Sequence, residues 1–198
     1  MIKRAQPLGV VCGSPYMSEL QAEQLAPISE WTPEYVLSLP KDEFDWLDFK
    51  RSDWLTLDAE CLDSLSRYLS AWANYDGGYL IIGIEVGGAQ LKADSGVDLT
   101  QKGGLKDWLE DKLPILVDDP LPQIGVASIP HRQEAHRGFV VIHVPASDRA
   151  PHQARNHRFY TRVGSKLQPL SKRAILDIIN RQKYPRVRSP QRLCDPAG

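Results

Sequence analysis

Cysteine is scarce in this chain, and long apolar runs are missing from it. The 198 residues include three cysteines, Cys12, Cys61 and Cys194, and no CxxC pair. An odd number of widely spaced cysteines argues against a disulfide framework and against a structural zinc site. No stretch approaches the ~20 apolar residues of a membrane helix, and Lys3 and Arg4 are not followed by the apolar segment of a signal peptide. These absences favour a cytoplasmic protein without a membrane partner.

Several signatures of enzyme sites are also missing. The chain has no HExxH motif and no GxSxG motif, and its five histidines all lie late in the sequence without the spacing of zinc ligands. Asp76-Gly77-Gly78 follows an expected helix and precedes an expected strand, which is the reverse of the P-loop order. Covalent catalysis and zinc chemistry therefore lack support, and a nucleotide-binding domain is the weakest of the functions considered.

The N-terminal part of the sequence is rich in acidic residues and the C-terminal part in basic residues, although the net charge is only -1. Residues 1–48 carry eight acidic residues and three basic ones, whereas residues 149–192 carry twelve Lys or Arg and a single acid, Asp177. A polyanion is attracted to such a basic region because each neutralised phosphate releases condensed counterions. The alternative is a solvated basic tail, especially for residues 181–192.

The apolar pattern predicts one domain with tails. We expect a flexible lead-in over residues 1–30, the domain over residues 31–183, and a disordered basic tail over residues 184–198. The run from Tyr79 to Ile84 is almost wholly apolar, which is typical of a central strand buried on both faces.

Turn and capping signals delimit the other elements. Thr32, Asp58 and Ser171 are expected to cap the starts of helices. The first helix ends at Pro40, and the second ends at Asp76-Gly77-Gly78. A further helix is predicted over residues 103–116, strands over 123–129, 139–144 and 158–162, and a hairpin turn at Val86-Gly87-Gly88. Together these elements predict an α/β (α+β) domain in which helices flank a mixed sheet.

Three acids and one lysine stand near the expected strand ends. Glu43, Asp48 and Glu85 are candidates for a shared site, because ligand crevices form at the carboxyl ends of strands in open α/β sheets. Grouped carboxylates would need a hard divalent cation or a basic partner. Each acid also has a structural interpretation, as a loop acid, an exposed strand residue or a turn residue. Lys50 shares a strand face with Asp48 and either pairs with it or touches a phosphate.

A basic stretch with interleaved aromatic residues occurs late in the chain. If the segment is a strand, Arg158, Tyr160 and Arg162 share one face, which suits phosphate contacts beside a stacking ring. The alternative is an exposed edge strand with cations that resist aggregation. The candidate nucleic-acid contacts are Lys50, Arg155, Arg158, Tyr160, Arg162, Lys166, Lys172 and Arg173.

Four sequence blocks in this order resemble the Schlafen AlbA-type domain family. They cover much of the segment from Glu43 to Arg181, and the most specific is Ser70-Ala71-Trp72-Ala73-Asn74-Tyr75-Asp76-Gly77-Gly78 with the apolar strand after it. The other blocks are Glu43 with Asp48-Phe49-Lys50, then Tyr160-Thr161-Arg162-Val163-Gly164-Ser165, and Ser171-Lys172-Arg173-Ala174-Ile175.

The resemblance implies a nucleic-acid-handling protein. In nuclease members of the family, three acids form a site that uses Mg²⁺ or Mn²⁺ to cut structured RNA. Glu43, Asp48 and Glu85 fall on the positions of those acids. The second acid is usually Glu and the third usually Asp, so Asp48 and Glu85 both depart from the pattern. A metal-dependent endoribonuclease is therefore implied beside plain RNA or DNA binding. The alternative is a non-catalytic DNA-binding, regulatory or protein-interaction module, acting as a homodimer or with a partner protein.

Overall fold

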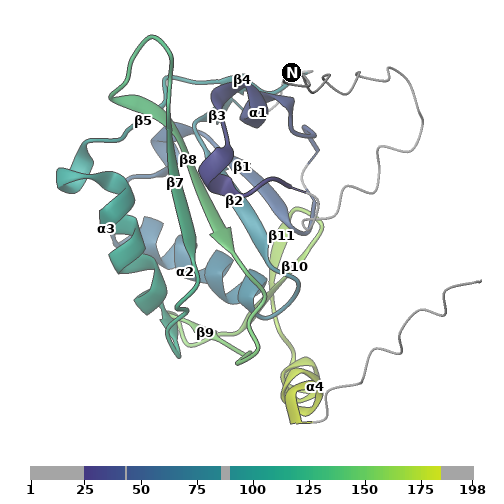
Figure 1. The fold of residues 1–198 in the computed structure, drawn as a ribbon. Coiled ribbons are helices and arrows are strands. Elements are labelled where there is room, and N and C mark those ends of the chain that lie inside the picture. Colours follow the sequence, from purple (N-terminus) through teal and green to yellow (C-terminus); the bar gives the residue numbers. More distant parts are fainter. Residues whose placement is uncertain (1–24, 43, 86–89, 184–198) are drawn as a thin grey trace, which may run out of the picture.

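The computed structural model describes residues 25–42, 44–85 and 90–183, and these residues fold around a five-stranded mixed sheet (Figure 1). The parallel strands β1 and β2 are neighbours, whereas β2, β5 and β7 each pair antiparallel with β8. The predicted α/β class with one mixed sheet is confirmed. The strands are β1 (Leu47–Lys50), β2 (Gly78–Ile82), β5 (Val97–Asp98), β7 (Gly125–Pro130) and β8 (Arg137–Val144).

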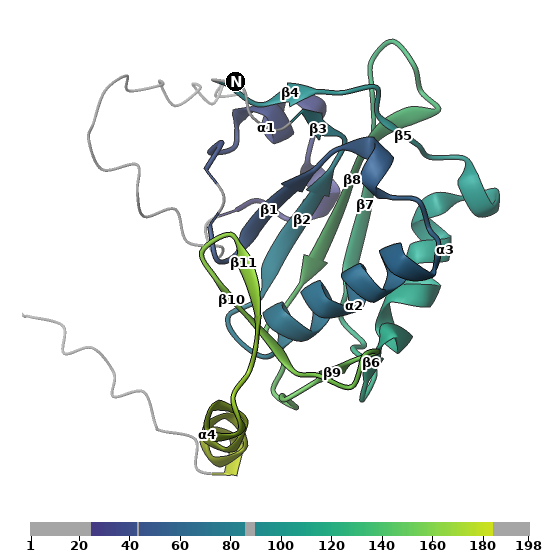
Figure 2. The same ribbon diagram turned by 180° about the vertical axis from the view of Figure 1, so that it is seen from behind.

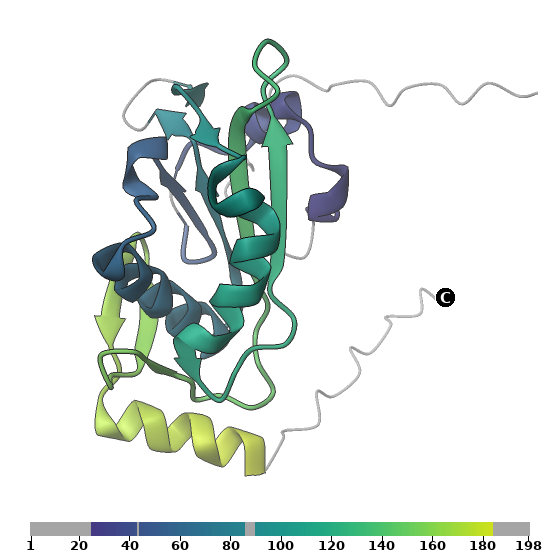
Figure 3. The same cartoon turned by 90° about the vertical axis from the view of Figure 1, so that its left-hand side faces the viewer.

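Helices and short strand pairs surround this sheet. Helices α2 and α3 cover one face, and α1 lies on the other (Figure 3). The helices are α1 (Pro33–Ser38), α2 (Ala59–Ala73), α3 (Leu105–Lys112) and α4 (Lys172–Lys183). The additional antiparallel pairs are β3 (Ile84–Glu85) with β4 (Lys92–Ala93), β6 (Val117–Asp118) with β9 (Gln153–Ala154), and β10 (Tyr160–Val163) with β11 (Lys166–Pro169). The β10–β11 hairpin lies beside β1 and α2, and α4 follows it away from the sheet (Figure 2).

The central strand is β2, as its apolar sequence predicts. All of its residues are buried. Leu80 and Ile82 belong to the core on the α2 side, while Tyr79 and Ile81 belong to the core on the α1 side. A strand with apolar residues on both faces is stable only when both faces are covered, which explains the helices on each side.

The predicted helix signals make the expected contacts. The side chains of Thr32, Asp58 and Ser171 each accept a hydrogen bond from the backbone N–H three residues later, at 3.2, 2.8 and 3.2 Å. Gly77 adopts a φ of +79°, and its N–H bonds to a carbonyl at the end of α2. A glycine is favoured in this left-handed conformation, so the chain can reverse directly from α2 into β2.

Three predicted elements differ from the structure. The run from Tyr79 to Ile84, predicted as one strand, is divided at Gly83, where φ is +108°, into β2 and the separate strand β3. The helix predicted over residues 103–116 is divided into α3 and a 3-10 turn over Leu113–Leu116, because Pro114 has no N–H for a continued α-helix. The strand predicted over 158–162 begins at Tyr160, since the chain turns at His157, where φ is +60°.

The packed part of the chain begins before the predicted boundary at residue 31. Leu25, Ala26 and Ile28 pack on the core of the α1 side, and the Trp31 Nε1–H donates to the Ala26 carbonyl at 2.8 Å. The predictions for residues 1–24, 86–88 and 184–198 lie outside the described residues. Over the part that is described, no helix has the length and apolar character needed to cross a membrane.

Candidate nucleic-acid interface

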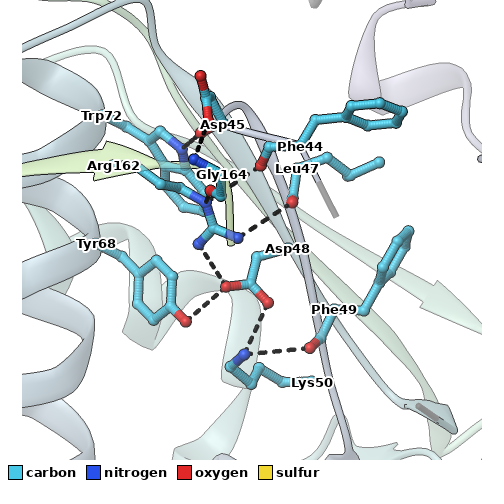
Figure 4. Close-up of polar contacts among 10 residues, drawn as sticks. All are labelled: Phe44, Asp45, Leu47, Asp48, Phe49, Lys50, Tyr68, Trp72, Arg162 and Gly164. Atoms are coloured by element: carbon cyan, nitrogen blue, oxygen red, sulfur yellow. Dashed lines mark hydrogen bonds and ion pairs between the residues drawn. The ribbon is translucent and has the colours of Figure 1, made fainter. Parts of the chain in front are cut away.

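Asp48 is a buried acid on the α2 side of the sheet. It lies in β1 beside Leu80 of β2, and only 1% of its side chain is exposed. One carboxylate oxygen accepts a hydrogen bond from Lys50 Nζ at 2.7 Å. The other accepts from the Tyr68 hydroxyl at 2.6 Å and from Arg162 Nη1 at 2.5 Å (Figure 4). Both oxygens are thus engaged, as a carboxylate removed from water requires.

Arg162 is the second buried charge of this cluster. It comes from β10, more than a hundred residues after Asp48 in the sequence, and 1% of its side chain is exposed. Beyond the ion pair, its Nε donates to the carbonyls of Phe44 and Gly164, at 3.2 and 3.0 Å. Its Nη2 donates to the Leu47 carbonyl at 3.4 Å. The planar guanidinium therefore joins the start of β1 to the turn of the β10–β11 hairpin.

Two aromatic side chains of α2 complete the enclosure of the guanidinium. Its central carbon lies 5.7 Å from the Tyr68 ring centre and 5.6 Å from that of Trp72, which is within cation–π range. Trp72 Nε1–H donates to the Asp45 carbonyl at 2.8 Å, and the Asp45 carboxylate accepts a bond from the Gly164 N–H. The hairpin turn is therefore fastened to β1 through both side-chain and backbone groups.

The ion pairs decide the ionisation of Asp48. Burial by itself would raise the pKa of this carboxyl, but the charges of Lys50 and Arg162 together hold it below its ordinary value. For Lys50, burial would lower the pKa, and the adjacent Asp48 carboxylate and Tyr68 raise it instead. The charged forms of both groups are therefore the stable ones.

Asn74 provides a second attachment of the hairpin to α2. Its Nδ2 donates to the carbonyls of His152 and Tyr160, both at 3.1 Å, and its Oδ1 accepts from the His152 N–H at 2.5 Å. Ser70, one turn earlier, accepts from the Tyr160 N–H at 3.0 Å. The block that carries the family resemblance thus contributes polar groups that hold the start of β10.

The residues predicted to form one exposed basic strand face differ in burial. Tyr160 and Arg162 do share a face of β10, but that face is inward, with 6% and 3% of each residue exposed. Arg158 precedes the strand and is exposed. Arg155 is exposed as well and lies 3.3 Å from the Asp63 carboxylate of α2.

The exposed cations lie at the two ends of the hairpin. Lys166 adjoins the turn, where it pairs with Val163. At the open end, the Leu170 N–H bonds to the Phe159 carbonyl at 2.8 Å, so Arg158 and the first turn of α4 leave the hairpin together. That first turn carries Lys172 and Arg173, both of which are exposed. The hairpin and its attachments therefore fix the positions from which these side chains extend.

The three candidate metal ligands are not alike. Glu43 lies outside the described residues. Asp48 is enclosed by two cations, whereas Glu85 is exposed at the end of β3, beyond Gly83 with its φ of +108°. Among the residues that the structure describes, no group of three or more His, Cys, Asp or Glu side chains could hold a metal ion.

The described residues do not fit a divalent cation at Asp48. Mg²⁺ and Mn²⁺ need carboxylate oxygens that are open to the ion and to its water ligands. Both Asp48 oxygens already accept hydrogen bonds from cations, and the residue has almost no exposed surface. No catalytic step through a metal follows from this arrangement.

A cavity of about 390 Å³ lies elsewhere, between α1 and the β7–β8 loop. Glu34, His131 and Phe139 are among its lining residues. Phe139 belongs to the core on the α1 side, whereas the Asp48 cluster lies on the α2 side. None of the candidate site residues that the structure describes lines this cavity.

Sequence reasoning missed the polar roles of Asp45, Tyr68, Trp72 and Asn74. Tyr68 and Trp72 occupy the apolar stripe of α2, and the periodicity correctly places them in the core. The signal that could have found their roles is the hydroxyl or indole N–H, which needs a partner when the ring is buried.

A search of curated protein sequences gives no match. Among solved structures, the crystal structure of the DIP2311 protein from Corynebacterium diphtheriae has 21% sequence identity and a TM-score of 0.47, over 70% of this chain and 24% of that chain. The chain thus spans about a quarter of the length of that protein.

A family model provides the identification. The model described as "Schlafen, AlbA_2" matches residues 43–171. This range contains α2, the central strand, the Asp48 cluster and the β10–β11 hairpin, and membership supports a function related to nucleic acids. The chain belongs to the Schlafen AlbA_2 family.

Proposed function

We propose that this protein binds RNA or DNA through the cations at the two ends of the β10–β11 hairpin. The observation that carries the proposal is the way in which the hairpin is held. Arg162 and Asn74 fasten it to β1 and α2, while Lys166, Arg158, Lys172 and Arg173 remain exposed around it.

A hairpin that is held in place, with exposed cations at its ends, suits a phosphate backbone. Lys and Arg side chains that extend from ordered backbone can neutralise phosphates at low entropic cost to the main chain. Tyr160 and Arg162 act in this proposal as positioning residues, because both are buried. The phosphate contacts therefore come from the exposed cations.

The experiment compares two variants with the same change in charge. Arg158, Lys172 and Arg173 are changed together to Gln in the test variant. The matched control changes Lys102, Lys106 and Lys112 of the α3 region to Gln. These lysines are also exposed, and they are far from the hairpin in the sequence. Gel shifts with end-labelled transfer RNA and single-stranded DNA should weaken strongly in the test variant and little in the control. Equal weakening would exclude the hairpin as the interface.

The same assay also tests for RNA cleavage and for the alternative function as a regulatory protein-interaction module. Metal-dependent cutting of structured RNA, the finer activity implied by the family, would appear as shortened RNA with Mn²⁺ or Mg²⁺ and not with EDTA. A regulatory contact with a protein would leave all the nucleic acids unshifted. Separate RNA and DNA probes distinguish the two polymers.

A further inference from the structure

Two half-buried aromatic residues lie beside the turn of the β10–β11 hairpin. Phe44 and Trp46 precede β1, their ring centres are 5.4 Å apart, and their ring planes differ by 3°. The Trp46 ring also lies 6.4 Å from that of Tyr79 in β2, at an angle of 84°. Phe44 and Trp46 both pack against the core on the α1 side. They therefore form an ordered aromatic pair at the margin of the core, partly accessible to solvent.

Hydrogen bonds place this aromatic pair against the hairpin turn. Arg162 Nε donates to the carbonyls of both Phe44 and Gly164, at 3.2 and 3.0 Å. The Gly164 N–H bonds to the carboxylate of Asp45, which stands between the two aromatic residues in the sequence. The Phe44 ring itself points away from the Arg162 guanidinium (Figure 4). Lys166 follows Gly164 by two residues, so this cation and the aromatic pair belong to the same end of the hairpin.

The aromatic ring that the sequence offers for stacking on a base is closed to one. Alternation predicts that role for Tyr160, but only 6% of that residue is exposed, and its hydroxyl accepts a hydrogen bond from Asn156. The Phe44–Trp46 pair brings half-buried rings to the same hairpin instead. Every base has a π-face, so such rings can stack on any base without a specific hydrogen-bond pattern.

Charge decides how a nucleic-acid strand would lie across this end of the hairpin. The Asp45 carboxylate adjoins the aromatic pair and would repel a phosphate placed over the rings. Lys166 is exposed and would attract one. A base on the rings, with a neighbouring phosphate at Lys166, satisfies both conditions.

We propose that Phe44 and Trp46 form a stacking platform for an unpaired base, and that this interface therefore takes single-stranded nucleic acid or the single-stranded regions of a folded RNA. The inference rests on the proposed nucleic-acid binding and names its class of ligand. Paired bases are stacked on one another inside a duplex, whereas unpaired bases can turn outward onto an aromatic ring.

The first arm of the experiment uses the wild-type protein alone. It compares short oligothymidylate and oligouridylate with abasic strands of the same length, which keep the phosphates and lack the bases. Fluorescence anisotropy should show about ten-fold tighter binding of the strands with bases, the effect of one stacked base. The salt dependence should be the same for both, because the phosphates are unchanged. Equal affinities would overturn the inference, and no altered fold can produce that result.

The second arm tests the ring of Trp46. Trp46→Leu keeps an apolar side chain but removes the ring, so it should lose about ten-fold in affinity for strands with bases and little for abasic strands. Trp46→Phe should retain most of the preference because it keeps a ring. Trp108→Leu, at a half-buried tryptophan of α3, is the matched control and should bind like wild type.

Thermal melts check that these variants are folded. A Trp46→Leu protein that loses both kinds of strand equally would show that the ring has a structural role only, and the platform would be wrong. A duplex of the same length should bind wild type and Trp46→Leu equally, since its bases are paired.

The two arms separate this inference from the proposed function. If both kinds of strand bind equally and the hairpin variant weakens both, the hairpin interface stands and the platform is wrong. If wild-type protein binds no strand of either kind, the interface and the platform both fail, as expected for a protein-interaction module.

Discussion

At the scale of single residues, the buried ion pair between Asp48 and Arg162 is the feature on which the proposed interface depends. A charge removed from water is stable only with a partner of opposite sign and with its hydrogen bonds satisfied. Asp48 and Arg162 meet that condition through each other and through Lys50, Tyr68 and backbone carbonyls. Replacing Asp48 or Arg162 therefore removes one of the partners that compensates the burial of the other.

Arg162→Gln should lower the free energy of unfolding by about 3 kcal/mol, the usual cost of breaking a buried ion pair. Lys50 remains as a partner of Asp48, but the three carbonyls bonded by the guanidinium lose their donor. Urea unfolding at neutral pH measures the change. Arg158→Gln, at an exposed position, should change stability by less than about 0.5 kcal/mol.

The pH dependence follows from the lowered pKa of Asp48. A carboxyl whose pKa is lower in the folded state contributes stability that is complete above its unfolded pKa and is lost as the pH falls through its folded pKa. Wild-type stability should therefore hold down to about pH 4 and decline below it. Asp48→Asn should be less stable at pH 7 and should lose less of its stability between pH 4 and pH 2. Parallel declines in the two proteins would show that other carboxyls account for the acid limb.

At the scale of elements, the β10–β11 hairpin depends on the conformation of its turn. Gly164 has a φ of +57°, and a Cβ at this position would meet no atom within 4 Å. The backbone conformation, and not a lack of space for a side chain, therefore favours glycine at this position. Its N–H also bonds to the Asp45 carboxylate, so the turn and the attachment to β1 share one residue.

Gly164→Ala should cost about 1 kcal/mol, because the left-handed conformation strains a residue with a Cβ. Gly164→Asn should cost less, since Asn adopts this conformation more readily than Ala. Both keep the N–H that bonds to Asp45. Denaturant midpoints of the two variants test the order, and a more stable Ala variant would contradict the account of the turn.

Asn74→Asp probes the second attachment. The substitution preserves shape and the acceptor for the His152 N–H, but it replaces the donor to the His152 and Tyr160 carbonyls with an oxygen. We expect a loss of about 2 to 3 kcal/mol from unsatisfied buried carbonyls facing a carboxylate. Exchange rates of the backbone amides in β10 should rise more than those in β2.

Much of the element order could be predicted, because caps, prolines and apolar periodicity act locally. Thr32, Asp58 and Ser171 act through contacts three residues away. The face of β10 that is buried could not be predicted in this way. Alternation places Tyr160 and Arg162 on the same side, but which side packs on α2 depends on partners about ninety residues away or more. The pairing of Asp48 with Arg162 could not be predicted either, because the two residues are also far apart in the sequence.

At the scale of the whole molecule, the uneven distribution of charge along the chain is the property that would attract a nucleic acid. The twelve Lys or Arg residues of the segment 149–192 include the hairpin cations, and a single acid accompanies them. Because Arg162 is buried, it does not contact a phosphate in this proposal. The number of phosphates contacted must therefore be smaller than the number of Lys and Arg residues in this segment. The salt dependence of binding gives that number directly.

The most direct test is the slope of log affinity for transfer RNA against log salt, measured in EDTA by fluorescence anisotropy. We predict steep, metal-independent binding, with a slope that falls by up to about three when Arg158, Lys172 and Arg173 become Gln, at roughly 0.9 per phosphate contact. The Lys102, Lys106 and Lys112 control should keep the wild-type slope. Binding that is insensitive to salt, or equal slopes in all three proteins, would contradict the assignment of the hairpin as a nucleic-acid interface.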